Sequence, residues 1–422
     1  MEPAAAPRGL GAAFARILDS AENASPVEAV TRGLGALLGA SRVSLLIADL
    51  SGRALVRLVH DVPDAAGDVA TEVLPFDGGP GEETLRTQTV RVLAPDEALP
   101  GSPTGQWTVL APVTERGEAL GLLEMSLPDE PGPAVLAEIS RTAHLLGFVV
   151  IANRRHTDLF EWGQRSTRFS LPAEIQRRLL PASFTCEAGS FTLSAWLEPA
   201  ATIGGDTFDY SLDREALHLS LTDAMGHGVA SALIATLCVG SLRNTRRQGA
   251  TLPEQALAAN RALLDQGREH EPIFATGLLG RMDLETGALA LVNAGHQMPY
   301  LLRGDEVASV ALPPGLPLGL FAEATYPVAD LKLEPGDRLV FVTDGMLERD
   351  AAGIDLETEI RNSGHLHPRE TTRRLADKVL ELAGSALQDD ATMLVLDWHG
   401  HHGRDRDTVA GAGLTQAGGA GG

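Results

Sequence analysis

Acidic residues stand at the ends of predicted strands in four separate motifs, and this placement constrains the fold more than any other feature of the sequence. Each motif also holds glycine or another small residue, which lets the backbone approach a bound group closely. The four aspartates are Asp206, Asp223, Asp344 and Asp389, and the strands predicted beside the last three cover residues 217–221, 339–342 and 393–396. Because strand ends in one packed sheet system can meet, we expect these four carboxylates to lie together.

Four clustered carboxylates repel one another and therefore need a cation. Two unit charges about 4 Å apart repel by roughly 4 kcal/mol at an effective dielectric of about 20. Ligand sets made only of oxygen favour the hard ions Mg²⁺ and Mn²⁺ over Zn²⁺. A single Asp-Gly pair is an ordinary turn, so the prediction of a metal site depends on all four motifs meeting.

The acidic composition argues against several classes of partner. The 422 residues include 34 Lys and Arg against 56 Asp and Glu, which gives a net charge of −22. Nucleic acid and anionic membranes are recognised through basic patches, so we expect neither as a partner. The sequence begins without a signal-peptide pattern, and residues 145–152, its longest membrane-like run, fall short of the roughly 20 residues of a membrane span. We therefore expect a cytoplasmic protein, in which Cys186 and Cys238 are inert thiols.

The pattern along the chain predicts two folded domains of an α+β protein, joined by a helical linker. The expected divisions are a flexible leader over 1–25, an α/β domain over 26–152, a helical linker over 153–182, a second domain over 183–398 and a disordered tail over 399–422. In the first domain we expect a helix over 27–38, a hairpin of strands 43–50 and 55–59, and a second strand pair over 107–113 and 119–127. In the second domain we expect a further strand over 289–292 and helices over 228–245, 253–267 and 369–386.

Apolar residues ahead of the linker follow a heptad-like spacing. They are Leu136, Ile139, Ala143, Leu146 and Val150. Such a seam is typical of a helix that pairs with a second copy of the chain, which would make the protein a homodimer. The other interpretation is an ordinary amphipathic helix packed on its own domain.

Six motifs occur in a fixed order between residues 204 and 392. They are Gly204-Gly205-Asp206-Thr207-Phe208-Asp209, Asp223-Ala224-Met225-Gly226-His227-Gly228, Asn293-Ala294-Gly295-His296, Gly315-Leu316-Pro317-Leu318-Gly319, Thr343-Asp344-Gly345-Met346-Leu347-Glu348 and Asp389-Asp390-Ala391-Thr392. Together they resemble the PPM (type 2C-like) serine/threonine phosphatases, in the branch of the stage II sporulation protein E phosphatase and the sigma-factor-regulating phosphatases. The resemblance covers about residues 170–398. It implies an α-β-β-α sandwich with two metal ions, Mn²⁺ or Mg²⁺, at one edge of the strands.

The resemblance also implies a role for individual residues. The implied metal ligands are the carboxylates of Asp206, Asp223, Asp344 and Asp389 and the backbone carbonyl of Ala224, with Asp223 bridging the two ions. Residues expected to support the site without binding metal are Asp209, Asp390, His227 and His296. A helix matching the family's Ile-Gln-x-x-Leu-Leu-Pro segment, which is implicated in switching, contributes Gln176, Leu179, Leu180 and Pro181.

The function that the resemblance implies is hydrolysis of phosphoserine or phosphothreonine on a protein. Two metal ions would activate a water, so no phosphoenzyme is expected. The implied substrate is a phosphorylated anti-sigma-factor antagonist. Two alternatives are a non-catalytic phosphoprotein-binding regulator of the same fold and a hydrolase of small phosphate esters.

Residues 26–152 more faintly resemble a GAF sensory domain. The resemblance depends on the order of predicted elements, the glycine-rich segment 78–81 and the strand segments 110–113 and 117–123. It implies that a signal at this domain controls the phosphatase through the helical linker. The other interpretation is a dimerisation domain that binds no ligand.

Overall fold

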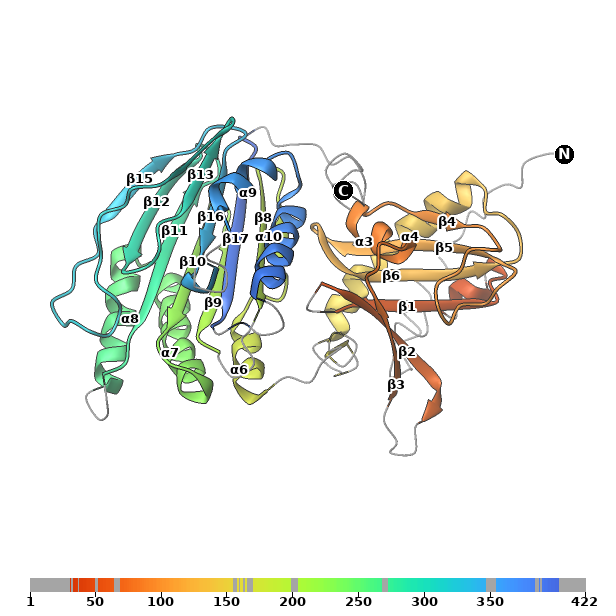
Figure 1. Cartoon of the computed structure of the whole chain (residues 1–422), viewed down its shortest axis with the longest axis horizontal. Coiled ribbons are helices and arrows are strands. Elements are labelled where there is room, and N and C mark those ends of the chain that lie inside the picture. The colour runs from red at the N-terminus through yellow and green to blue at the C-terminus, as the bar shows by residue number, and fades with distance from the viewer. Residues whose placement is uncertain are drawn as a thin grey trace. The chain divides into compact units, whose positions relative to one another are not determined.

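The computed structural model of the chain forms two compact units (Figure 1), which divide between Arg168 and Phe169. The structure describes residues 31–401 apart from 32, 37, 50–51, 64–68, 155–157, 159, 162–163, 165–169, 199–203, 268–271, 347–353, 384–386 and 388. The predicted leader and nearly all of the predicted tail lie outside the described residues, as does part of the predicted linker.

The N-terminal unit is built on a six-stranded antiparallel sheet with the order β3-β2-β1-β6-β5-β4. Its elements are β1 (Arg42–Ala48), β2 (Ala54–Pro63), β3 (Val69–Pro75), α3 (Pro80–Thr87), β4 (Arg91–Leu93), β5 (Trp107–Glu115), β6 (Glu118–Leu127) and α4 (Pro133–Asn153). The two predicted strand pairs are confirmed, because β1 pairs with β2 and β5 pairs with β6. The likeness of this unit to a GAF domain stays a prediction.

The heptad-like seam lies on α4 and faces the core of its own unit. Ile139, Ala143, Leu146 and Val150 are buried in one cluster with residues of β5 and β6. This packing favours the interpretation of an ordinary amphipathic helix, while the homodimer stays a prediction.

By length and composition alone, α4 is also apolar enough to cross a membrane, which corrects the expectation that no stretch of the chain reaches that length.

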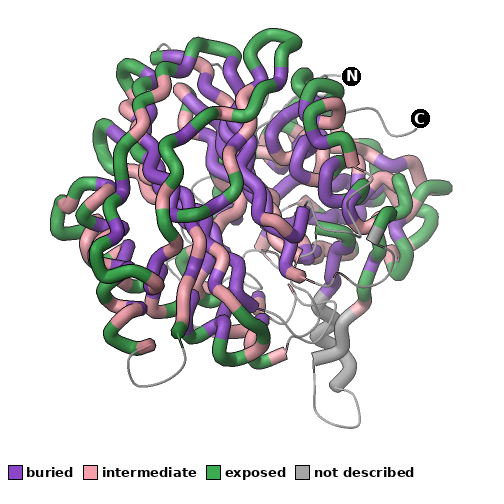
Figure 2. Tube along the Cα trace, turned by 60° about the vertical axis from the view of Figure 1, so that its left-hand side comes forward, coloured by how far each residue is buried: buried purple, intermediate pink, exposed green. Residues whose placement is uncertain are grey.

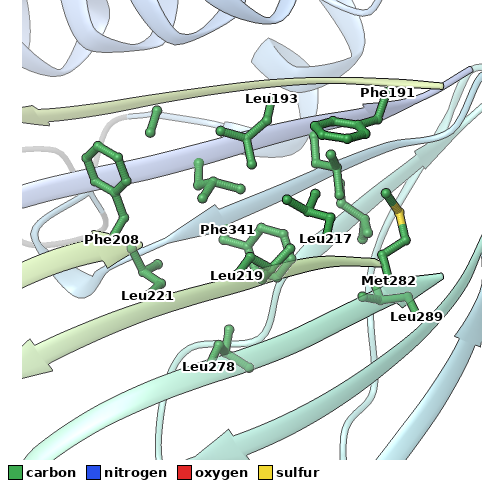
Figure 3. Packing of buried hydrophobic residues seen from close by; sticks show 14 of the residues in the cluster. Phe191, Leu193, Phe208, Leu217, Leu219, Leu221, Leu278, Met282, Leu289 and Phe341 are labelled. Atoms are coloured by element: carbon green, nitrogen blue, oxygen red, sulfur yellow. The ribbon is translucent and has the colours of Figure 1, made fainter. Parts of the chain in front are cut away.

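The C-terminal unit contains two antiparallel sheets. One has the order β15-β12-β11-β10-β9 and the other has the order β14-β13-β16-β17-β8-β7. The strands are β7 (Thr185–Glu187), β8 (Phe191–Glu198), β9 (Asp206–Leu212), β10 (Ala216–Ala224), β11 (Ala275–Asp283), β12 (Ala288–Ala294), β13 (Tyr300–Arg303), β14 (Glu306–Ser309), β15 (Val328–Lys332), β16 (Arg338–Val342) and β17 (Ala391–Trp398). Side chains from both sheets, including Phe208, Leu219 and Phe341, interdigitate between them (Figure 3) and form the largest core of this unit.

Helices cover the outer faces of both sheets. They are α6 (Leu171–Leu179), α7 (Gly228–Arg247), α8 (Leu252–Gly267), α9 (Leu356–Asn362) and α10 (Pro368–Ala383). An apolar cluster joins α7 and α8 to the first sheet, and a separate cluster joins α9 and α10 to the second. The layers are therefore α-β-β-α, and buried residues follow the strands through the middle of the unit (Figure 2).

The short helix α6 has local signals at both of its ends. Ser170 caps its N-terminus by accepting a hydrogen bond from the Ala173 backbone N–H, and Pro172 occupies the first turn. Both features are favourable at a helix start, and Pro181 follows directly after its end. α6 belongs to the C-terminal unit and packs against α7, so it is part of that unit's surface.

Candidate metal centre

Asp206 and Asp223 face each other at one end of the first sheet. Asp206 is the first residue of β9, Asp223 is the penultimate residue of β10, and the two are directly paired in the antiparallel ladder. The prediction that Asp223 follows its strand is wrong, because pairing with both β9 and β11 extends β10 to Ala224. Directly opposed side chains on one ladder lie close together, so the first two predicted ligands are neighbours.

Asp344 and Asp389 stand at one end of the second sheet. Asp344 opens a short 3₁₀ helix, η2 (Asp344–Met346), just after β16, and Asp389 lies two residues before β17. Since β16 and β17 are antiparallel and Val342 pairs with Met393, the end of one strand meets the start of the other. The prediction of strand-end positions is confirmed for both residues.

Two threonine hydroxyls join the two sheets at this end. Thr343 Oγ1 and Thr392 Oγ1 both donate hydrogen bonds to Asp206 Oδ2, at 2.7 Å and 2.6 Å. Both threonines belong to the second sheet's motifs, whereas Asp206 belongs to the first sheet. The sequence motifs contain these residues, but their role was not predicted. The hydroxyls fix the Asp206 carboxylate beside the acids of the opposite sheet.

The carboxylates raise one another's proton affinity. Burial, followed by repulsion from Asp344, Asp389 and Asp390, raises the pKa of Asp223 to about 7. Burial and the charge of Asp223 raise the pKa of Asp206 well above its usual range, and burial with the charge of Asp344 raises that of Asp389. The four predicted ligands therefore lie within electrostatic reach of one another.

The donor set at this edge suits a hard divalent cation. Its side chains supply only oxygen, and mutual repulsion is the condition that a cation relieves. Among the residues that the structure describes, no three His, Cys, Asp or Glu side chains converge into a formed metal cluster. The oxygen-only donor set nevertheless has the chemistry that the predicted ions require.

The raised pKa of Asp223 predicts a pH dependence in the metal-free protein. The folded state holds the Asp223 proton more tightly than the unfolded chain does. The resulting contribution to the free energy of unfolding is complete below about pH 4 and is lost as the pH rises through about 7. Asp223→Asn removes the charge. We expect the substitution to raise the free energy of unfolding more at pH 8 than at pH 5, by about 1–3 kcal/mol. Urea unfolding in a chelator measures the effect. An equal change at both pH values would contradict the assignment.

Asp390 supports the backbone of the predicted ligand Asp206. Its Oδ2 accepts hydrogen bonds from the backbone N–H groups of Gly205 and Asp206, at 3.0 Å and 3.3 Å, and from Gln176 Nε2 at 2.7 Å. Gln176 Nε2 lies 2.8 Å from the carbonyl oxygen of Asp206 as well. Gln176, on α6, therefore contacts the backbone of Asp206 and the side chain of Asp390, which is next to the predicted ligand Asp389.

Asp209 provides a second attachment of α6. Its carboxylate forms ion pairs with Arg243 and Arg246 of α7, at 2.9 Å and 3.0 Å. Arg243 also donates a hydrogen bond to the backbone carbonyl of Leu179, at the end of α6. The expected supporting role of Asp209 thus corresponds to a link between β9, α7 and α6.

The two motif histidines differ in their surroundings. His296 is buried, its Nδ1 lies 2.7 Å from Thr276 Oγ1, and its backbone is bound on both sides by the amide of Asn293. Burial lowers the pKa of His296 to about 4, so the ring is neutral near pH 7. His227 is exposed and precedes α7 as its N-cap residue. A structural role fits His296, and its exposed position keeps His227 accessible to a substrate.

Two glycines allow close backbone contact at the centre. A Cβ on Gly345 would lie 2.0 Å from the carbonyl oxygen of Asp390, and a Cβ on Gly205 would lie 2.4 Å from that of Ala224. No side chain fits at such distances. The Ala224 carbonyl, the predicted backbone ligand, therefore lies directly against the Gly205-Asp206 segment.

The match to a family model lies within the C-terminal unit. Residues 213–399 match the family model described as Stage II sporulation protein E (SpoIIE). Phosphoserine phosphatase RsbU of Bacillus subtilis (strain 168) is 25% identical over 236 residues, which cover 54% of this chain and 70% of RsbU. Protein IcfG of Synechocystis sp. (strain ATCC 27184 / PCC 6803 / Kazusa) is 27% identical over 203 residues, which cover 42% of this chain and 32% of IcfG.

Among solved structures, the SiaA-PP2C domain of Pseudomonas aeruginosa is 19% identical with a TM-score of 0.45, covering 54% of this chain and 94% of that one. The RsbU and RsbW domains of Rv1364c from Mycobacterium tuberculosis are 25% identical with a TM-score of 0.43, covering 52% of this chain and 62% of that one.

Proposed function

We propose that this chain is a metal-dependent protein serine/threonine phosphatase, because its residues 213–399 match the family model of Stage II sporulation protein E and its relative RsbU is a phosphoserine phosphatase. The observation that carries the proposal is that acids from two sheets lie at one edge: Asp206 pairs with Asp223 in the first sheet and accepts hydrogen bonds from Thr343 and Thr392 of the second. The proposed ligands of two Mn²⁺ or Mg²⁺ ions are Asp206, Asp223, Asp344, Asp389 and the Ala224 carbonyl.

Bound divalent ions at this edge would activate a water and neutralise charge on the phosphoryl oxygens. The chain's own residues position the ligands for that chemistry. Thr343 and Thr392 fix the Asp206 carboxylate, and Asp390 fixes the backbone that carries it. Asp223 would be one of the residues that hold the ions, and a carboxylate binds metal in its ionised form. Metal binding therefore has to lower the pKa of Asp223.

The proposed substrate is a regulatory protein phosphorylated on serine or threonine, of the anti-sigma-factor antagonist type. Two relatives, RsbU and RsbP of Bacillus subtilis, carry the name phosphoserine phosphatase, which supports this choice of phosphate ester. We further propose that the protein acts in the cytoplasm as a homodimer and that the N-terminal unit, as a GAF-like sensor, controls its activity.

A dephosphorylation assay tests the proposed function. Candidate phosphorylated antagonists from the same genome are incubated with the full chain in Mn²⁺ or in a chelator, beside p-nitrophenyl phosphate and nucleotides. We expect Mn²⁺-dependent phosphate release from the phosphoprotein. Binding without release would favour the non-catalytic regulator, and release from nucleotides alone would favour a small-ester hydrolase.

We propose that α6 carries the control, because its Gln176 reaches Asp390 and the Asp206 carbonyl. Gln176→Leu removes both hydrogen bonds and leaves buried polar atoms without their donor. Supporting residues of this kind typically change metal affinity or activity by about 10–100-fold. We therefore expect the Mn²⁺ concentration for half-maximal p-nitrophenyl phosphate hydrolysis to rise by about that factor.

The matched control is Arg178→Leu on the same helix. Arg178 pairs with Glu174 at 3.0 Å on the exposed face, where an ion pair contributes about 0–1 kcal/mol. Its Mn²⁺ requirement should stay within about twofold of the unmodified protein's. Equal responses of the two variants would show that α6 does not act through Gln176.

A further inference from the structure

The segment between β14 and β15, residues 310–327, is apolar although much of it lies at the surface. It contains a single charged side chain, Glu323, whereas charged residues make up 21% of the chain. Leu316 and Phe321 are 43% and 48% exposed. Two large apolar side chains are therefore exposed on one loop that carries a single charge.

Hydrogen bonds hold the backbone beneath these two side chains. Leu318 and Ala275 exchange both backbone hydrogen bonds, at 2.8 Å and 2.9 Å. The fully buried amide of Asn260 accepts from Gly319 N at 2.7 Å and donates to the Phe321 carbonyl at 2.9 Å. Leu316 and Phe321 are therefore displayed from a fixed loop, which lowers the conformational entropy lost when a partner binds.

The same loop lies beside the proposed metal centre. Ala275, the partner of Leu318, pairs on its other side with Ala224, which follows Asp223. Neighbouring strands are about 4.8 Å apart, so the Leu318 backbone lies about 10 Å from the end of β10. A folded protein that brings a phosphoserine to this edge would come close to the loop.

We propose that Leu316 and Phe321 form a docking surface for an apolar patch of the folded phosphoprotein substrate; this inference rests on the proposed phosphatase function. The loop that carries it lies two strand spacings from the end of β10, at the edge where the phosphate would react. This chain is strongly acidic and the substrate carries a phosphate, so negative charges on the two proteins repel each other. Apolar contacts provide attraction without adding to that repulsion. A rigid aromatic side chain is the kind of residue that anchors such an interface.

The test compares Leu316→Glu/Phe321→Glu with a matched control, Leu382→Glu. Leu382 is 47% exposed on α10, which covers the other sheet. Each protein is assayed on p-nitrophenyl phosphate, a short phosphoserine peptide and the folded phosphoprotein from which the peptide is taken. We expect kcat/KM on the folded phosphoprotein to fall about 10–100-fold in the double variant alone, with the two small substrates unchanged.

Other outcomes would overturn the docking surface. An equal loss on all three substrates would place the loop in support of the metal centre, and an unchanged rate on the phosphoprotein would exclude docking. A change in sedimentation of the double variant would assign the surface to a second copy of the chain. Binding of the phosphoprotein is measured in parallel, so docking is tested even if the unmodified protein hydrolyses nothing. Absence of hydrolysis by the unmodified protein would contradict the proposed function, not the docking surface.

Discussion

Asp223→Asn should abolish metal-dependent phosphate release while the protein stays folded. Asp223 is paired with Asp206 and lies within electrostatic reach of Asp344 and Asp389, so it would hold metal together with these three carboxylates. Bound metal supplies several kcal/mol of transition-state stabilisation, and each 1.36 kcal/mol is a factor of ten in rate. We expect a loss of at least about 1,000-fold in p-nitrophenyl phosphate hydrolysis at saturating Mn²⁺.

Asp330→Asn is the matched control for this substitution. Asp330 lies exposed on β15, the edge strand of the same sheet, and the change removes the same charge. Its hydrolysis rate should equal that of the unmodified protein, and circular dichroism should show both variants folded. Near-normal turnover by folded Asp223→Asn would remove Asp223 from the metal centre.

Gly345→Ala should damage both stability and activity. The added methyl group would lie 2.0 Å from the Asp390 carbonyl oxygen, a backbone atom within the strand-end segment that carries Asp389. Either Asp344 or Asp389 must therefore move. Overpacking of this kind costs about 1–3 kcal/mol, and the displaced ligand should reduce hydrolysis by about 100-fold or more.

Gly240→Ala is the matched control, because it makes the same glycine-to-alanine substitution at a position with room for a methyl group. Gly240 lies in α7, and a Cβ there meets no other atom within 4 Å. Alanine is favoured over glycine in helices by about 1 kcal/mol, so this variant should be more stable and fully active. Thermal unfolding and p-nitrophenyl phosphate hydrolysis compare the two variants. A Gly345→Ala protein as stable and active as the unmodified chain would contradict the close packing of the two motifs.

The positions of the acids at the strand ends were predictable because local signals define them. Apolar runs predicted β10, β16 and β17, and motifs of aspartate with small residues beside them predicted where the strands end. Asp223 was misplaced because the end of β10 depends on its ladders with β9 and β11, which join residues distant in sequence. Local turn signals carry no information about such ladders.

The supporting contacts could not be predicted for a related reason. Thr343 and Thr392 bind Asp206 across the two sheets, and Gln176 reaches Asp390 from a helix more than two hundred residues earlier. No spacing rule links residues at such separations. The seam of α4 was ambiguous for a simpler reason, since a heptad pattern fits a partner helix and the helix's own sheet equally well.

The most direct test of the account is to locate divalent ions in the protein. Crystals grown with Mn²⁺ are measured for anomalous scattering, once with the unmodified chain and once with Asp223→Asn. The account predicts two peaks in the unmodified chain, bound by Asp206, Asp223, Asp344 and Asp389, and the loss of at least one in the variant. Mn²⁺ absent from this edge at saturating concentration, or bound elsewhere without these carboxylates, would contradict it.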